Sequence, residues 1–208
     1  MGFPLMFSAI QLLLVNLFTD GPPAVALGFN PKDVDVMKEK PRDINESVIT
    51  TWLLTRYLVT GLYIGLATIG IFASYYQSLG LSLDHLSHWS TCSVWSAQNL
   101  DLCQELFEPE ALAVPRTLAL STLVLTELLK ALSTVSVDSS ILKVPPFLNR
   151  YLVLGVSIPF SLHIAILYIP FLSKTFGLVR LSVEQWIAVV LWSLPVLLVD
   201  EVLKAIGR

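Results

Sequence analysis

The sequence predicts an all-α membrane protein, a bundle of five transmembrane helices. Of its 208 residues, 54% are hydrophobic and only 14% are charged, and the mean hydropathy is +0.71, whereas soluble domains carry about 25% charged residues. No charged residue lies between Arg56 and Asp84 or between Arg150 and Lys174, and such runs are long enough to cross a lipid bilayer. The net charge of −3 offers no basic face, so we expect the bilayer as a partner and no nucleic acid.

Two of the five expected spans are weak by hydropathy alone. The third contains Arg116, Glu127 and Lys130, and the fifth ends in Asp200 and Glu201. Polar residues in membrane helices usually face the interior of a bundle, so both segments still fit the prediction. The spans are expected at residues 3–28, 52–76, 112–133, 151–172 and 184–203.

Loop charges predict how the bundle is oriented. The segment 29–47 contains three lysines and one arginine, whereas 77–111 contains neither residue type. Cytoplasmic loops carry an excess of Lys and Arg. We therefore expect 29–47, 134–150 and the C-terminus in the cytoplasm, and 77–111 in a lumen or outside the cell. Five spans then place Met1 on the non-cytoplasmic side, which fits the C-terminal part of a longer chain.

Cys92 and Cys103 are the only cysteines, and both lie in the segment without Lys or Arg. Because oxidising compartments permit disulfides, this pair is typical of a luminal disulfide. Two free thiols are the alternative.

The first span ends in a group of polar oxygen donors. On an α-helix, Asn16, Thr19 and Asp20 stand at i, i+3 and i+4 and point from one face. Pro22 and Pro23 lack N–H groups, so two carbonyls before them lose their helical partners. Carboxylate, amide, hydroxyl and carbonyl oxygens are the ligands that Ca²⁺ takes. This pattern indicates a site for a hard cation inside the membrane.

Glu127, midway along the third span, is placed to supply a second carboxylate. Purely structural roles for these polar residues are the alternative to an ion site. Asn and Thr in membrane helices form interhelical hydrogen bonds, and Asp20 can pair with a basic residue elsewhere. Lys130 follows Glu127 at i+3 and can form an ion pair with it. Spacing alone does not decide between the two roles.

The chain resembles one family of ion pumps over nearly its whole length. The stretch "QLLLVNLFTDGPPAVALGFNPKDVDVMKEKPR" closely resembles the sixth transmembrane helix and following cytoplasmic loop of sarco/endoplasmic reticulum calcium pumps, which are P-type ATPases. "LVLTELLKALSTVS" resembles their eighth helix, "VPPFLNRYLVLGVSIPFSLHIAILY" the ninth and "LSVEQWIAVVLWSLPVLLVDEVLKAIGR" the tenth. The resemblance implies part of a P-type ATPase transmembrane domain, multi-pass in the endoplasmic or sarcoplasmic reticulum membrane.

By this resemblance four residues are calcium ligands. Asp20 would reach both ions, Thr19 and Glu127 would belong to one site, and Asn16 to the other. Plasma-membrane and secretory-pathway calcium pumps have methionine in place of Thr19, although "DGPPA" is similar to the secretory-pathway type. Thr19, Glu127 and "GFNP" together favour the two-site reticulum pump.

The resemblance implies further features away from the ion site. It implies a luminal disulfide between Cys92 and Cys103, and contacts of Asp33 and Asp35 with the phosphorylation domain. Lys130 departs from the pattern, because the animal pumps have an uncharged residue there. We expect its side chain to turn toward the cytoplasmic interface rather than toward Glu127.

The sequence contains no DKTGT phosphorylation motif and no nucleotide-binding or actuator domain. The resemblance therefore implies Ca²⁺ as the transported ion, with ATP and Mg²⁺ as cofactors only of a full-length parent. Implied partners are the N-terminal part of the pump or a full-length pump, and small regulatory membrane peptides. Two functions follow. The chain is either the C-terminal transport segment of an ATP-driven pump that moves Ca²⁺ from the cytosol into the endoplasmic reticulum lumen, or a non-enzymatic, pump-derived interaction or regulatory fragment.

Overall fold

The computed structural model describes residues 4–30, 49–88, 105–108, 110–135, 147 and 149–207. Within them the chain forms helices and no strands, so the predicted all-α fold is confirmed. The first helical segment is broken into α1 (Ala9–Leu14), the π-helix η1 (Val15–Thr19) and α2 (Gly21–Leu27). The other helices are α3 (Thr51–Ser78), α4 (Leu83–Ser87), α6 (Ala113–Ser133), α7 (Arg150–Tyr168), α8 (Pro170–Phe176), α9 (Val183–Ser193) and α10 (Pro195–Ile206).

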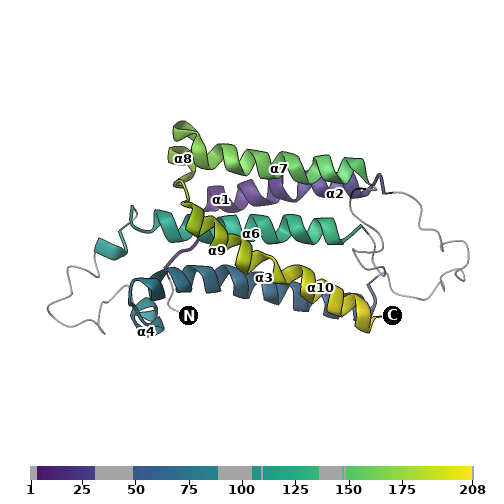
Figure 1. Ribbon diagram of the computed structural model, residues 1–208, viewed down its shortest axis with the longest axis horizontal. Coiled ribbons are helices and arrows are strands. Elements are labelled where there is room, and N and C mark those ends of the chain that lie inside the picture. Colours follow the sequence, from purple (N-terminus) through teal and green to yellow (C-terminus); the bar gives the residue numbers. More distant parts are fainter. Residues whose placement is uncertain are drawn as a thin grey trace, which may run out of the picture.

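The long helices lie side by side along the long axis of the molecule (Figure 1). Helix α6 is central, because it packs against α3 and α10, against α9 and against α7. Helix α2 lies along α7 on one side of α6, and α3 lies with α10 on the other (Figure 1). More than half of the residues of α6 that the structure describes are buried, including Leu120, Val124 and Leu128.

Among the residues that the structure describes, four segments are long and apolar enough to cross a membrane. They are Ala9–Leu27, Thr51–Ser78, Arg150–Tyr168 and Val183–Ile206. Helix α6, with 21 residues, has the length of a span but carries Arg116, Glu127 and Lys130. Its central position explains how a helix with three charged residues fits the bundle, since each of these residues is partly buried. The orientation in a bilayer stays a prediction.

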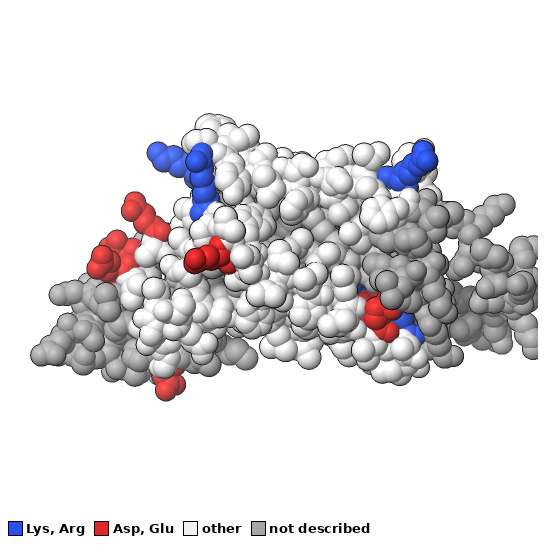
Figure 2. All heavy atoms as spheres, in the orientation of Figure 1, with Lys and Arg blue, Asp and Glu red and all other residues white. Residues whose placement is uncertain are grey.

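Charged side chains lie toward the two ends of the face shown in Figure 2, and the middle of that face shows none. Such an uncharged band is typical of a surface in contact with lipid tails, because burying a charge in hydrocarbon is costly. Many large apolar side chains are exposed on the bundle, among them Leu58, Leu62, Leu154 and Leu198. The surface therefore fits the predicted membrane setting.

Prolines divide two of the segments in which the sequence predicts a continuous span. In 151–172, α7 ends at Tyr168 and Pro170 begins the short helix α8, which Gly177 caps at its C-terminus with a φ of +62°. In 184–203, Pro195 begins α10 directly after α9. Proline fits the first turn of a helix but lacks the N–H that would continue the preceding one. Most of the loop predicted at 29–47, with Asp33 and Asp35, lies outside the described residues, and so does the part of the loop 77–111 that contains Cys92 and Cys103.

Helix α7 fixes the end of the broken first segment. Asn149 caps α7 by accepting a hydrogen bond from the Leu152 N–H on its Oδ1 (3.1 Å). Its Nδ2 donates to the carbonyl of Ala26 in α2 (3.1 Å) and to Oδ1 of Asn30 (3.1 Å). The residues that follow the break at Asp20 are therefore held against a separate helix.

Candidate cation site

The candidate site begins where the first helical segment loses its α-helical geometry. The N–H of Asp20 donates to the carbonyl of Val15 (3.3 Å), an i to i+5 bond that is typical of a π-helix. Pro22 and Pro23 have no N–H, and the next backbone donor, Ala24, bonds to the carbonyl of Asp20 (3.2 Å). The prolines therefore cannot donate the usual helical bonds to the two carbonyls before Asp20, and oxygen donors become available at the break.

Three of the four predicted ligands line one cavity of about 300 Å³. Thr19 and Asp20 come from the broken segment, and Glu127 comes from the middle of α6. Two carboxylates and a hydroxyl from separate helices thus face a common space. The remaining lining residues are Pro23, Ala24, Leu27, Ile64, Lys130, Ala131 and Thr134.

Asn16 does not line this cavity and is exposed, whereas Thr19 is buried. The expectation that Asn16, Thr19 and Asp20 point from one face rests on α-helical spacing. The structure differs, because the i to i+5 bond of η1 makes the turn wider than an α-helical turn. The π-helix therefore separates Asn16 from the two residues that reach Glu127.

Glu127 is half-buried, and its Oε2 is buried without a hydrogen-bond partner among the described residues. Buried polar atoms are nearly always paired, so an unpaired carboxylate oxygen indicates a partner that the described residues do not supply. Those residues contain no group of three or more His, Cys, Asp or Glu side chains placed to hold a metal ion. The cavity supplies only part of a coordination shell.

Lys130 lies one turn after Glu127, yet no ion pair joins them in the part of the chain that the structure describes. Its ammonium bonds instead to Oδ1 of Asp200 in α10. A fully buried carboxylate on α10 thus attracts the ammonium instead of Glu127, and the expected turn toward the cytoplasmic interface stays a prediction. The simple Glu127–Lys130 pair that spacing left open is therefore absent here.

Asp200 is the centre of an ionic cluster that joins α3, α6 and α10. Its Oδ1 also accepts from Nη2 of Arg56 (2.9 Å), and its Oδ2 lies 3.1 Å from Nζ of Lys204 and accepts from Oγ of Ser133. From the sequence, Asp200 is recognised only as a charge near the end of the fifth span. An aspartate in an otherwise apolar span, with Lys204 at i+4, was the signal that it has buried partners. We call this the Asp200 cluster; its members are Arg56, Lys130, Ser133, Asp200 and Lys204.

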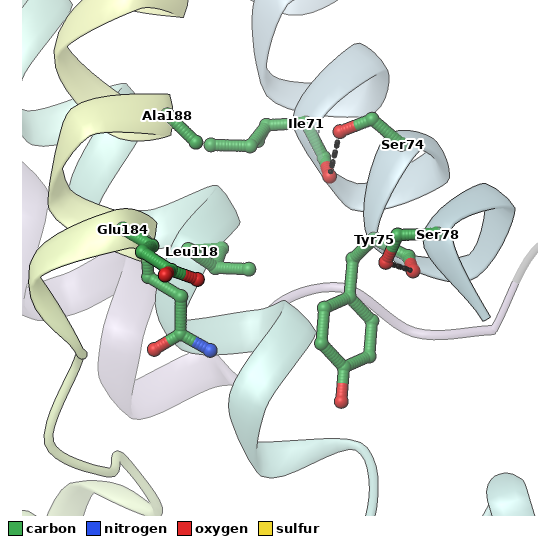
Figure 3. Close-up of a pocket in the computed structure, with 8 residues that line it drawn as sticks. Ile71, Ser74, Tyr75, Ser78, Leu118, Glu184 and Ala188 are labelled. Carbon is green, nitrogen blue, oxygen red and sulfur yellow. Dashed lines mark hydrogen bonds between the residues drawn. The ribbon is translucent and has the colours of Figure 1, made fainter.

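A second cavity, of about 340 Å³, lies between α3, α6 and α9 (Figure 3). Its two serine hydroxyls already donate to the backbone of α3, Ser74 to the Ile71 carbonyl (2.9 Å) and Ser78 to the Tyr75 carbonyl (2.6 Å). Glu184 is the one carboxylate that lines it. Leu118, in its wall, precedes Glu127 by nine residues, or about 14 Å along α6. With a single carboxylate, this cavity offers fewer anionic oxygens than the one that Asp20 and Glu127 line.

Comparison with known proteins identifies the family. Residues 4–206 match the family described as "Cation transporting ATPase, C-terminus". The chain belongs to this family. The family expected from the sequence is therefore confirmed, and the described helices are those of the C-terminal membrane region of a cation-transporting ATPase.

Three relatives extend this result. "Calcium-transporting ATPase 4, endoplasmic reticulum-type" of Arabidopsis thaliana is 42% identical over 235 aligned residues, which cover 100% of this chain and 22% of the relative. "Calcium-transporting ATPase 2, endoplasmic reticulum-type" of the same plant is 42% identical over 236 aligned residues, which cover 100% of this chain and 22% of the relative. "Calcium-transporting ATPase" of Plasmodium falciparum is 41% identical over 217 aligned residues, which cover 98% of this chain and 18% of the relative. The chain spans about a fifth of the length of these relatives.

Proposed function

We propose that this chain acts as the C-terminal membrane segment of an ATP-driven calcium pump that moves Ca²⁺ from the cytosol into the endoplasmic reticulum lumen. The observation that carries the proposal is the cavity in which Thr19, Asp20 and Glu127 meet. Hydroxyl and carboxylate oxygens are ligands that Ca²⁺ prefers. The ion and the compartment are those in the names of the two plant relatives.

Each ligand has a distinct role in this proposal. Asp20 lies at the helix break, where its carboxylate can reach two neighbouring ions, and Thr19 and Glu127 complete one of the two sites. Ca²⁺ takes six to eight oxygens, whereas these three side chains provide five at most. Other helices of a full-length pump, backbone carbonyls and water supply the rest. Exposed Asn16 contributes to the second site together with those helices.

ATP hydrolysis with Mg²⁺ belongs to the parts of the relatives that this chain does not span. In the proposal, Asp33 and Asp35 contact the phosphorylation domain, and Cys92 and Cys103 form a disulfide in the lumen. Partners are the N-terminal part of the pump, or a full-length pump, and small regulatory membrane peptides. The large apolar side chains exposed on the bundle support contacts with lipid and with further membrane helices.

The test is a full-length endoplasmic reticulum-type pump in which this chain replaces the C-terminal membrane segment. Asp20→Asn and Glu127→Gln should each abolish high-affinity, calcium-dependent phosphorylation by ATP, because each removes one of few anionic ligands. Asp84→Asn and Glu184→Gln are matched controls, since both carboxylates are exposed and outside the cavity. Undiminished calcium affinity in the Asp20 variant would show that the site is assigned to the wrong residues.

A further inference from the structure

Lys130 lies between the cavity carboxylates and the buried carboxylate of Asp200. It lines the cavity that contains Asp20 and Glu127, and its ammonium bonds to Asp200 on the other side. Residues at i and i+3 of an α-helix have β-carbons about 5–6 Å apart, so rotation of the Lys130 side chain alone can bring the ammonium to Glu127. The position of one flexible cation therefore decides whether the carboxylate of Glu127 is neutralised.

The other lysine of the Asp200 cluster has no such freedom. Lys204 is fully buried, and its three N–H donors are matched by Oδ2 of Asp200 (3.1 Å), the Ser133 carbonyl (2.6 Å) and Oγ of Ser133 (3.0 Å). Lys130 retains 20% exposure of its side chain, and its one described partner is Asp200. An ammonium has three donors, so two of them remain for another acceptor. Lys130 is the member of the cluster that is able to move.

Asp200 contacts more cationic side chains than a single ion pair between two helices would need. Its one carboxylate faces Arg56, Lys130 and Lys204, and Lys204 also lies 3.9 Å from Oε1 of Glu201. A positive charge that moves toward a cation site repels the incoming cation. Loss of Asp200 would release the Lys130 ammonium, and Glu127, one turn earlier on α6 and in the wall of the same cavity, is then available to it.

We propose that Asp200 is a positioning residue of the cation site, which holds the Lys130 ammonium against α10 and so keeps the Glu127 carboxylate available to Ca²⁺. The positioning role rests on the proposed function for the identity of the ion. The location of Lys130 does not depend on the proposed function. The network makes Ca²⁺ affinity depend on the contact between α6 and α10, although Asp200 itself does not line the cavity.

The location of Lys130 is tested without calcium on the 208-residue chain in membranes. A membrane-permeant carbodiimide joins a carboxylate to an adjacent amine with loss of water, and mass spectrometry locates the amide. The unmodified chain should yield the Lys130–Asp200 product and little Lys130–Glu127 product. Asp200→Asn should reverse this pattern, with at least about a tenfold gain of the Lys130–Glu127 product. A dominant Lys130–Glu127 product in the unmodified chain would overturn the proposal, and this measurement does not depend on how the Asp200 variant folds.

The effect on the ion is tested by calcium titration of phosphorylation in the full-length chimera. Asp200→Asn should weaken the apparent calcium affinity about tenfold or more, whereas Lys130→Asn alone should change it by less than about threefold. Adding Lys130→Asn to Asp200→Asn should restore most of the affinity, because no ammonium remains to reach Glu127. An equal loss with and without Lys130 would show that Asp200 is only structural and would overturn the proposal.

Glu201→Gln removes a neighbouring carboxylate of α10 that contacts Lys204 (3.9 Å) rather than Lys130, and it serves as the charge-matched control. Asp20→Asn in the same chimera distinguishes failure of the proposed function from failure of the positioning role proposed for Asp200. If Asp20→Asn leaves calcium affinity unchanged, the proposed function is wrong, while the cross-linking result still decides where Lys130 lies.

Discussion

Gly155 of α7 lies so close to Pro22 of α2 that a β-carbon added at position 155 would come within 2.9 Å of the Pro22 carbonyl oxygen. The same β-carbon would lie 2.8 Å from Cβ of Ala26. Neither neighbour can rotate away, because one is backbone and the other is the only side-chain carbon of its residue. Small residues at such contacts let membrane helices approach closely. Gly155 therefore sets the distance between α7 and the helix that follows the break at Asp20.

Gly155→Ala should destabilise the protein by about 1–3 kcal/mol, the usual effect of overpacking a tight contact. Thermal unfolding of the purified chain in detergent measures the change. The control is Gly65→Ala in α3, where an added β-carbon meets nothing within 4 Å. Because alanine favours a helix over glycine, the control should be neutral or stabilising by up to about 1 kcal/mol. Equal effects of the two substitutions would contradict the close contact.

A buried polar pair joins α6 to α7. Oγ of Ser121 lies 3.0 Å from Nε2 of His163, both residues are buried, and Nδ1 of His163 has no partner among the described residues. Ser121→Ala should cost about 1–3 kcal/mol, because it leaves the imidazole unpaired in an apolar interior. Adding His163→Leu should recover much of that loss. A double-mutant cycle from detergent unfolding measures the coupling, and additive effects would show that the pair does not interact.

Asn149 has two roles that a substitution series can separate. The Asn149→Ser change would keep a side-chain cap for α7 but lose the bonds to Ala26 and Asn30, so it reports the tie to α2. Asn149→Ala loses both, and should be less stable than Asn149→Ser by about 1 kcal/mol, the usual contribution of an N-cap. Unfolding of the two variants in parallel gives this difference. Identical stabilities would mean that the side-chain cap contributes nothing.

Much of the fold follows from hydropathy and much of the site from helical spacing. The charge-free runs after Arg56 and Arg150 predict α3 and α7 closely, because an apolar run in a membrane has few alternatives to a helix. The polar face at Asn16, Thr19 and Asp20 was predicted only in part. The π-helix at Val15–Thr19 is fixed by its neighbours and by the prolines that follow, and i, i+3, i+4 spacing does not encode it.

The ion-pair partners within the Asp200 cluster could not be predicted from the sequence. Its members lie on three helices, and Arg56 is 144 positions away from Asp200 in the chain. Each charge can be recognised as out of place in a span, but its partner depends on how the helices pack. The pairing of Lys130 with Asp200 rather than with Glu127 is such a case, since local spacing favours the neighbour on the same helix.

The predicted orientation has a direct test in membranes. Glycosylation or cysteine-labelling tags at 85–90 should report the lumen, and tags at 36–40 the cytoplasm. The reason is the excess of Lys and Arg in 29–47 and their absence from 77–111. Each position serves as the control for the other. A luminal signal from the 36–40 tag would mean that the number of spans before or after it is wrong.

Calcium binding by the 208-residue chain alone tests how much of the site it contains. The cavity offers one hydroxyl and two carboxylates. Ca²⁺ requires six to eight oxygens, and water would have to complete the shell. So few protein ligands bind the ion weakly, and we therefore expect affinity in the millimolar range or weaker, and no calcium-activated ATPase activity. Equilibrium calcium binding in detergent measures the affinity, and phosphate release measures the ATPase activity.

The Asp20→Asn chain is the control and should bind calcium still more weakly. Micromolar binding by the unmodified chain would show that these residues form a sufficient site by themselves, which would contradict the partial shell inferred from the cavity.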